Sequence, residues 1–382
     1  MNIVIISSSY KPNIGGVEEL TSKLCVAYND KGHDSCVATS QWPASLSNHE
    51  IIDDVEINRF NFILPSTNIV SILKFITIFP ITFIKFCNYL KRMNPDIVNI
   101  QCASSNGFYA LLAKRILKFK LVVTLQGETV MDDYDIYNKS SILRWTLRKL
   151  MKEAEWVTAN SNYTLNDAIE RFGGDRSKCS VIYNGVDLGE FKGTEPYEHS
   201  KPYIYATGRL VYKKGFDLLI KAFSKIADKY KDIDLLISGK GDYEEELTLI
   251  IKTLGLEDRV KLLGPADRKM NVSLFKGCDF FVMPSRLEPF GIVCLEAMAA
   301  GKPIIFTNNG GTKEFVNNTF GIKINTENIN EFKGALETLL SDVIKCKEMG
   351  RIANEEVQKF NWAQITEEYL VIYERIVKNN EK

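Results

Sequence analysis

Histidine is scarce in this sequence, and cysteine occurs without the spacing of metal or redox sites. The three histidines, His33, His49 and His199, fall in polar segments, so we expect surface residues rather than a histidine-based triad or a metal site. The eight cysteines show no CxxC or Cys/His pattern, and several fall in apolar runs. They predict reduced, mostly buried thiols of a cytosolic protein.

An excess of charge of either sign is also missing. The 48 Lys and Arg residues balance the 48 Asp and Glu residues, which offers no electrostatic footprint for nucleic acid. A hydrophobic content of 45% and a charged content of 25% are typical of a soluble globular protein, and 382 residues suffice for about two domains. The first ten residues, MNIVIISSSY, enter a strand without a basic or long apolar leader, so we expect no secretion signal.

No uninterrupted apolar run reaches the ~20 residues that span a bilayer. The most apolar stretch, Ile69 to Leu90, is divided by Lys74, Pro80 and Lys85, so a transmembrane helix is not expected. Two interpretations stay open. The stretch is a helix that covers a sheet, which we favour, or an interfacial surface that touches a membrane beside the Lys-Arg pair that follows it.

Strand and helix patterns alternate in two successive halves. Continuous apolar strands followed by amphipathic helices predict two α/β domains, each a parallel doubly wound sheet. The YNGVD segment at 183–187 and the polar stretch up to Pro202 break the pattern, and we place the interdomain linker there. Near the C-terminus, helices at 329–341 and 362–377 are expected to flank a junction that contains Gly350. A ligand is expected in a cleft between the halves.

Two carboxylates lie eight residues apart across a strand-loop-helix junction, in the segment DFFVMPSRLEPFGIVCLEAMAAGKPII. Phe280 to Met283 predicts a buried strand, and a short helix is expected to begin near Gly291. Glu288 therefore lies in the loop and Glu296 inside an apolar helix. The vicinal hydroxyls of a ribose or hexose suit such an acceptor-only group. For one glutamate alone, a helix-dipole contact or a structural ion pair is the more ordinary explanation.

Three glycine-rich turns follow predicted strands, where open α/β sheets bind ligands. Gly15 and Gly16 precede a helix whose amides can meet a phosphate or a sugar, although a simple tight turn explains them equally well. In GRLVYKKG, Arg209 and Lys214 form a phosphate clamp in outline, with Gly208 allowing close approach. The third turn, SGKG at 238–241, carries only a fragment of a dinucleotide fingerprint.

Two further segments carry weaker signals. In NNGGT, a glycine pair precedes a helix that is expected to begin near Thr312, and a turn with an N-cap explains this segment. The acidic cluster of Asp132, Asp133 and Asp135 has the ligands for a divalent ion, but a solvated loop is favoured, so no metal site is predicted.

Taken in this order, the motifs resemble the retaining glycosyltransferases of family 4, which have the GT-B architecture. The resemblance spans nearly the whole chain, and its most specific elements are the pairs Arg209 with Lys214 and Glu288 with Glu296. The tail FNWAQITEEYLVIYERIV resembles the terminal helix of that family, which crosses back to the first domain. The implied fold has two Rossmann-like domains facing across a cleft: 1–185 with 362–382 on the acceptor side, and 186–361 on the donor side.

The resemblance assigns roles to these residues. Arg209 and Lys214 would hold the donor diphosphate, Glu296 would accept from the ribose hydroxyls, and Glu288 would lie by the donor sugar. Catalytic roles would fall to Arg209, Lys214 and Glu288. The implied donor-binding set is Gly15, Gly16, Gly208, Arg209, Lys214, Glu288, Pro289, Phe290, Gly291, Ile292 and Glu296.

One departure concerns the acceptor side. Many members of the family have a histidine where this chain has Gln126, which can donate or accept a hydrogen bond but cannot take up a proton as a base. The acceptor-side candidates are Gln126, Glu128 and Asp132.

The implied reaction is transfer of a hexosyl or N-acetylhexosaminyl unit from a nucleotide diphosphate sugar to a hydroxyl of a glycan or lipid-linked acceptor, with retention and without a cofactor. A UDP-sugar is favoured over a GDP-sugar, and the expected setting is cell-surface polysaccharide or lipopolysaccharide synthesis at the cytoplasmic face of the membrane. Alternatives are a nucleotide-sugar epimerase or phosphorylase on the same frame, and a non-catalytic sugar-nucleotide-binding protein. A dinucleotide-dependent oxidoreductase is disfavoured because a complete GxGxxG is missing.

Overall fold

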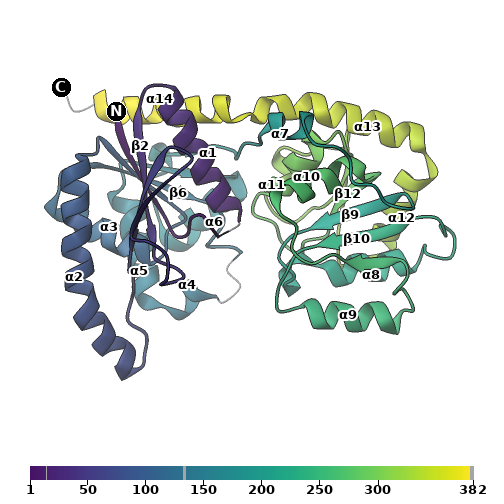
Figure 1. The fold of residues 1–382 in the computed structure, drawn as a ribbon, viewed down its shortest axis with the longest axis horizontal. Helices are drawn as coiled ribbons and strands as arrows, with labels where there is room; N and C mark the ends of the chain where they lie inside the picture. Colours follow the sequence, from purple (N-terminus) through teal and green to yellow (C-terminus); the bar gives the residue numbers. More distant parts are fainter. Residues whose placement is uncertain (14, 132–134, 379–382) are drawn as a thin grey trace. The chain divides into compact units, whose positions relative to one another are not determined.

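The computed structural model describes residues 1–13, 15–131 and 135–378. The chain forms two compact units, Met1–Asn184 together with the C-terminal helix α14 (Trp362–Lys378), and Gly185–Asn361 (Figure 1). Each unit has its own sheet and its own hydrophobic core. All eight cysteines lie in the described part of the chain as free thiols, six of them buried, as the sequence predicts.

The first unit is built on a sheet with the strand order β3-β4-β2-β1-β5-β6-β7-β8. Only the β3-β4 hairpin is antiparallel among its described strand pairs. The chain proceeds outward from β1 in one direction and returns to β5 on the other side, so a topological switch point lies between β1 and β5. The strands are β1 Asn2–Ser7, β2 Asp34–Ser40, β3 His49–Ile52, β4 Val55–Phe60, β5 Ile97–Gln101, β6 Lys120–Leu125, β7 Trp156–Ala159 and β8 Cys179–Val181.

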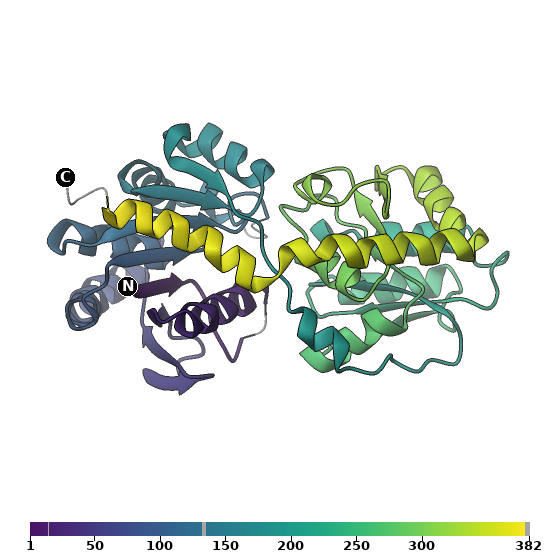
Figure 2. The ribbon, with the colours of Figure 1, turned by 90° about the horizontal axis from the view of Figure 1, so that it is seen from above.

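Helices cover both faces of this sheet because residues alternate between the faces along β1. Val4 and Ile6 pack with α2, α3, α5 and α6, whereas Ile3 and Ile5 pack with α1 and α14. Tyr28 on α1 donates to Tyr373 on α14 at 3.3 Å, and Figure 2 shows α14 lying along the unit. The helices are α1 Gly16–Asp30, α2 Ile69–Met93, α3 Ser105–Ile116, α4 Ile136–Lys139, α5 Ser141–Glu153 and α6 Asn162–Phe172.

The second unit has an all-parallel sheet with the order β11-β10-β9-β12-β13-β14. Its switch point lies between β9 and β12. The strands are β9 Tyr203–Thr207, β10 Asp234–Ser238, β11 Val260–Leu262, β12 Phe280–Met283, β13 Ile304–Thr307 and β14 Gly321–Ile324. The helices are α7 Leu188–Lys192, α8 Phe216–Ser224, α9 Glu244–Thr253, α10 Arg268–Gly277, α11 Ile292–Ala299, α12 Ile329–Ser341 and α13 Val343–Glu356. The doubly wound α/β class is confirmed in both units.

We expected Gly350 at a junction between helices, but it lies inside α13. A Cβ at this position would lie 2.1 Å from the carbonyl oxygen of Gly301. The glycine therefore serves the close packing of α13 on the turn after α11, and tertiary contact outweighs its poor helix propensity.

The apolar stretch is not divided as predicted. Helix α2 continues from Ile69 to Met93 with Pro80 inside it. Proline removes one amide donor, but packing of Phe86, Tyr89 and Leu90 in the core holds the C-terminal half in place. Within the described part of the chain, α2 is the helix long and apolar enough to cross a membrane, with a mean hydropathy of 1.9 over a window of which 11% is buried.

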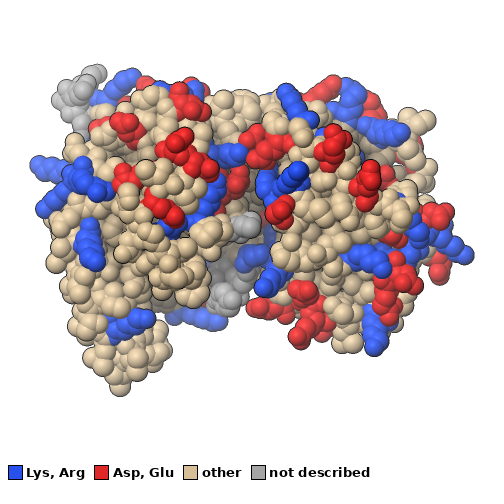
Figure 3. Space-filling model, in the orientation of Figure 1, with Lys and Arg blue, Asp and Glu red and all other residues tan. Residues whose placement is uncertain are grey.

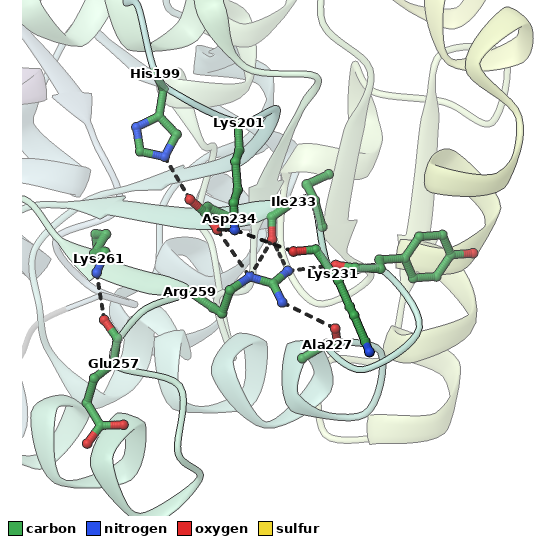
Figure 4. Close-up of polar contacts among 10 residues, drawn as sticks. His199, Lys201, Ala227, Lys231, Ile233, Asp234, Glu257, Arg259 and Lys261 are labelled. Carbon is green, nitrogen blue, oxygen red and sulfur yellow. Dashed lines mark hydrogen bonds and ion pairs between the residues drawn. The ribbon is translucent and has the colours of Figure 1, made fainter.

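The expected surface role is wrong for His199. Its Nε2 lies 2.8 Å from Oδ2 of Asp234, a residue that is 4% exposed at the start of β10. The Nε of Arg259 donates to the other Asp234 oxygen at 3.1 Å, and its guanidinium also binds the Ala227 and Ile233 carbonyls (Figure 4). This cluster fixes the segment before β9 at the amino end of the sheet, where ligands of open α/β sheets do not bind.

Candidate functional site

The switch point of the second unit brings together a cation and a carboxylate. Lys214 follows β9 and Glu288 follows β12, and the Lys214 Nζ lies 2.7 Å from Glu288 Oε2. The Ser285 hydroxyl donates to the same oxygen at 2.9 Å. Because Glu288 is only 6% exposed, this carboxylate needs both partners in the free protein. Arg209 lies exposed at the end of β9, five residues before Lys214.

Arg286 locks the two loops together. Its amide donates to the Lys213 carbonyl at 2.9 Å, and its guanidinium forms two bonds with Asp217, at 2.8 and 2.9 Å. It also lies 3.8 Å from the centre of the Tyr212 ring. Burial raises the pKa of Asp217, but the hydrogen bonds and the positive charge of Arg286 lower this pKa by more, so that it lies below its ordinary value. This pair was not predicted; its signal is a carboxylate within the apolar segment FDLLI and an arginine two residues before Glu288.

The NNGGT turn serves the Glu288 loop. Gly311 donates its amide to the Glu288 carbonyl at 2.9 Å. Gly310 has φ +129°, and a Cβ there would lie 1.9 Å from that carbonyl oxygen, so only glycine allows the approach. The helix expected near Thr312 is only a short 3₁₀ turn, Thr312–Glu314, and Gly311 before it has no side chain to cap it. The Thr312 hydroxyl donates to the Phe290 carbonyl at 2.7 Å.

Helix α11 begins directly behind Glu288. Gly291, with φ +90°, precedes the helix and has no side chain to cap it. Phe290 lies in this turn and Ile292 is the first residue of the helix, so the amides of Phe290, Gly291 and Ile292, which the resemblance implies as donors, stand at the helix start, and Pro289, which has no amide hydrogen, precedes them. Helix N-termini of this kind favour anions and hydrogen-bond acceptors.

Glu296 lies on α11, 7% exposed, and is bound by the Arg268 guanidinium. The Nε of Arg268 also contacts Glu190 at 2.6 Å, and Asn271 lies 3.5 Å from Glu296 Oε2. Although burial lowers the pKa of Arg268, the two carboxylates raise it above its ordinary value. The structural ion pair that the sequence left open is thus present. Arg268 was missed because its polar segment, ADRKMN, resembles a loop.

The SGKG turn is explained by packing. Gly239 has φ +147°, and a Cβ there would lie 1.9 Å from the Gly208 carbonyl oxygen. A Cβ at Gly241 would lie 2.3 Å from the Leu210 carbonyl oxygen. The glycines therefore let the loop after β10 lie against the loop that carries Arg209.

In the first unit, Gly15 and Gly16 stand at the start of α1, as predicted. Both are exposed, and Gly15 is in an extended conformation. A Cβ at Gly15 would lie 2.5 Å from Glu18 Oε2, so a carboxylate already occupies the space beside this helix start. An acceptor-only group there favours sugar hydroxyls over a phosphate.

Gln126 follows β6, and its side chain is part of an amide network. It donates to Gln101 Oε1 at 2.9 Å and accepts from Asn184 at 3.2 Å. Gln101 in turn donates to Asn99 at 2.7 Å. The glutamine thus links the ends of β5 and β6 to the YNGVD segment.

Glu128 binds two backbone amides, those of Ala103 at 2.9 Å and Gln126 at 2.6 Å. Burial raises the pKa of Glu128 to about 7, against the lowering effect of these amides. Asp132, the third acceptor-side candidate, lies outside the described residues, as does Asp133. Within residues 1–13, 15–131 and 135–378, no group of three or more His, Cys, Asp and Glu side chains is suited to a metal ion.

Two protein families match adjoining parts of the chain. Residues 14–190 match the family described as Glycosyltransferase Family 4, and residues 190–356 match Glycosyl transferases group 1.

Over the aligned residues, the relatives are about a quarter to a third identical to the chain. It is 32% identical to an uncharacterized glycosyltransferase of Methanocaldococcus jannaschii over 53% of its own length and 55% of that protein. It is 28% identical, over 76% of its length and 79% of the relative, to the N-acetylgalactosamine-N,N'-diacetylbacillosaminyl-diphospho-undecaprenol 4-alpha-N-acetylgalactosaminyltransferase of Campylobacter jejuni. A GDP-mannose-dependent monoacylated alpha-(1-6)-phosphatidylinositol monomannoside mannosyltransferase of Corynebacterium glutamicum is 26% identical over 94% of each chain.

Solved structures establish the fold. Sucrose-phosphate synthase from Thermosynechococcus elongatus has a TM-score of 0.80 at 18% identity, over 99% of each chain. Anabaena HepE in complex with UDP-glucose has a TM-score of 0.74 at 21% identity, also over 99% of each chain. The fold is GT-B, as the sequence predicts.

Proposed function

Since the chain belongs to glycosyltransferase family 4 and is a glycosyltransferase, we propose that it transfers a hexosyl or N-acetylhexosaminyl unit from a nucleotide diphosphate sugar, with retention of the anomeric configuration. The acceptor is a hydroxyl of a glycan or of a lipid-linked sugar. The observation that carries the proposal is the Lys214–Glu288 pair at the switch point of the second unit.

This pair has the two functions that donor binding requires. A diphosphate needs cations, which Lys214 and the exposed Arg209 supply, and a sugar needs acceptors for its hydroxyls, which Glu288 supplies. In the free protein the two side chains satisfy each other at 2.7 Å. On donor binding, Lys214 turns to the phosphate and Glu288 to the sugar, while the Ser285 hydroxyl continues to bind the carboxylate.

The main electrostatic problem of the reaction is the charge on the leaving diphosphate. The bond between the anomeric carbon and the phosphate oxygen breaks, and a bond to the acceptor oxygen forms on the same face. The departing phosphate oxygen takes the acceptor's proton. Arg209, Lys214 and the first-turn amides of α11 stabilise the charge that develops on this oxygen.

Glu296 holds the nucleoside end of the donor through the ribose hydroxyls. Its carboxylate is oriented by Arg268, which also pairs with Glu190. A carboxylate held in this way accepts hydroxyl donors without reorganisation. We propose residues 186–361 as the donor domain, and residues 1–185 with 362–382 as the acceptor-side domain, where Gln126 and Glu128 are the described candidates for acceptor binding.

The relatives suggest the substrate class. HepE was solved with UDP-glucose, which favours a uridine donor, while the Corynebacterium relative is named for GDP-mannose. The Campylobacter relative is named for a diphospho-undecaprenol-linked acceptor. We therefore propose a UDP-sugar donor, a lipid-linked acceptor and a role in cell-surface polysaccharide or lipopolysaccharide synthesis at the cytoplasmic membrane face.

The test is a panel of UDP- and GDP-sugars. We expect one uridine donor to raise the melting temperature and to be hydrolysed slowly without an acceptor, releasing the sugar first as the anomer present in the donor, as read by NMR. Release of the opposite anomer would disprove retention. If no sugar nucleotide bound or turned over, the proposed function would be wrong.

A further inference from the structure

Helix α2 exposes an apolar stripe that nothing in the described structure covers. Ile69, Leu73, Ile76 and Ile84 recur at helical spacing and are 74, 58, 60 and 59% exposed. Ile81 stands beside them, 59% exposed. Single exposed isoleucines are ordinary on a soluble protein, but a continuous row along one helix marks an interaction surface.

A row of cations borders the stripe. Lys74, Lys85 and Arg92 are spaced so that they share one side of the helix, and Lys91 stands on the stripe itself beyond Ile84. The sequence of α2 contains no Asp or Glu. Figure 3 shows the far end of α2 as a tan projection that carries blue and no red on the face in view. Lysines beside apolar residues and without acids fit an anionic lipid surface rather than an ordinary protein partner.

The opposite face of α2 keeps the helix from spanning a bilayer. Phe86, Tyr89 and Leu90 are buried in the core of the first unit, where Phe86 contacts the rings of Phe60 and Phe62 at 5.3 and 5.2 Å. Inserting the whole helix would expose that aromatic cluster. Only the outer face is available, so the helix must lie along the membrane and not across it.

A polar pocket of about 410 Å³ lies beside the stripe, between α2 and the β3-β4 hairpin. Ile81 and Lys85 line it on the helix side, and Asn58 and Asn61 line it on the other. With the stripe in the acyl boundary, these amides and Lys85 stand at the depth of the polar headgroups. Amide side chains and a lysine are the groups that bind sugar hydroxyls and phosphate.

We propose that α2 is a membrane-docking helix: its stripe of Ile69, Leu73, Ile76, Ile81 and Ile84 inserts into the outer part of an anionic bilayer, and Lys74, Lys85 and Lys91 bind the lipid phosphates. The docking surface would bring the enzyme to a lipid-linked acceptor, and in that respect alone it rests on the proposed function. A second copy of the chain and a protein partner are the competing occupants.

The test is cosedimentation of the full chain with vesicles of phosphatidylcholine, with or without phosphatidylglycerol. We expect binding to anionic vesicles that weakens with salt, and little binding to neutral ones. The variant Ile76→Ser with Ile84→Ser should bind about 10-fold more weakly. The matched control is Ile116→Ser with Ile344→Ser, which removes two isoleucines that are 62 and 84% exposed on other surfaces and should bind like the parent.

A second variant separates charge from apolar contact. Lys74→Gln with Lys85→Gln should lose about 10-fold in binding to anionic vesicles and none to neutral ones, whereas Lys323→Gln with Lys345→Gln should not. Equal binding by the isoleucine variant and the parent would overturn the proposal. The proposal would also be overturned if analytical ultracentrifugation showed that the parent is a dimer and that the variant Ile76→Ser with Ile84→Ser is a monomer. Donor hydrolysis by the parent is measured in parallel without vesicles. If the parent hydrolysed no donor, the proposed function would be refuted, but the vesicle-binding result would still test the docking helix.

Discussion

Replacing Lys214 by methionine tests whether the Lys214–Glu288 contact is a coupled, buried pair. The substitution keeps most of the length of the side chain and removes its charge. Glu288, 6% exposed, then retains the Ser285 hydroxyl at 2.9 Å but no cation at 2.7 Å. Breaking a buried pair costs about 3 to 5 kcal/mol, and the Lys214 side chain is 18% exposed, so we expect a loss of ~2 to 4 kcal/mol.

The assay is denaturant unfolding of the parent, the two single variants and the double variant Lys214→Met with Glu288→Gln. Glu288→Gln leaves Lys214 without its carboxylate, but the lysine can reach water, so the free energy of unfolding should fall by only ~1 kcal/mol. The double variant should recover much of the loss, with a coupling of about 1 to 3 kcal/mol. Thermal unfolding should show Lys214→Met melting ~5 to 12 °C below the parent.

A matched control lies in the same unit. Lys229 Nζ contacts Glu337 Oε1 at 2.8 Å, nearly the same distance, but the lysine side chain is 65% exposed. Lys229→Met should therefore leave the stability nearly unchanged. Additive effects of the Lys214 and Glu288 substitutions, or equal costs at Lys214 and Lys229, would refute the reasoning. Donor turnover should stay ~10- to 100-fold low in the double variant despite its recovered stability, since both donor contacts are gone.

Other substitutions test the remaining parts of the site. Glu296→Ala should lower kcat/KM for the donor by about 10- to 100-fold, and parent-like turnover by the folded variant would remove Glu296 from the site. Arg286→Met leaves the buried Asp217 carboxylate with only the half-exposed Lys221 as a cationic partner, at 3.4 Å, and should cost ~3 kcal/mol in denaturant unfolding; a loss within error of zero would contradict the loop-locking role. Gly310→Ala should destabilise the protein and lower turnover, because the Cβ would lie 1.9 Å from a carbonyl oxygen, whereas the control Gly334→Ala meets nothing within 4 Å and should be neutral or stabilising. The folded-state pKa of Glu128 is about 7, above its ordinary 4.5, so the stability that protonated Glu128 contributes is fully present below pH 4.5 and is lost as the pH rises through 7. Between pH 4.5 and 7 the parent should therefore lose free energy of unfolding relative to Glu128→Gln, and parallel pH profiles of the two proteins would contradict the raised pKa.

The local features of the site followed well from the sequence. Apolar runs of four to six residues gave the strands that precede each motif, and glycines and prolines marked where those strands ended. The positions of Glu288 in a loop and Glu296 in a helix are both confirmed. Such signals are local, because they depend on the backbone preferences of neighbouring residues and on the side-chain period of a strand or helix.

The misses share a cause in contacts between distant residues. Gly350 was taken for a helix boundary because its reason for being glycine, the Gly301 carbonyl, is 49 residues away. A helix was expected near Thr312, where the structure has a short 3₁₀ turn whose Thr312 hydroxyl donates to the distant Phe290 carbonyl. His199 was taken for a surface residue because Asp234 and Arg259 lie on the neighbouring strand segments. Helix α10, which carries Arg268, has few apolar residues in its first turn and was not recognised.

The sequence by itself determined that this chain folds into parallel α/β halves and which turns carry the cations, carboxylates and glycines. Tertiary structure alone decided how those groups pair. Lys214 and Glu288 are 74 residues apart and meet because the chain returns from β11 to place β12 directly beside β9. Glu296 and Arg268 are 28 residues apart and meet because α10 packs against α11. Strand order and helix packing depend on the whole core, so no local pattern encodes them.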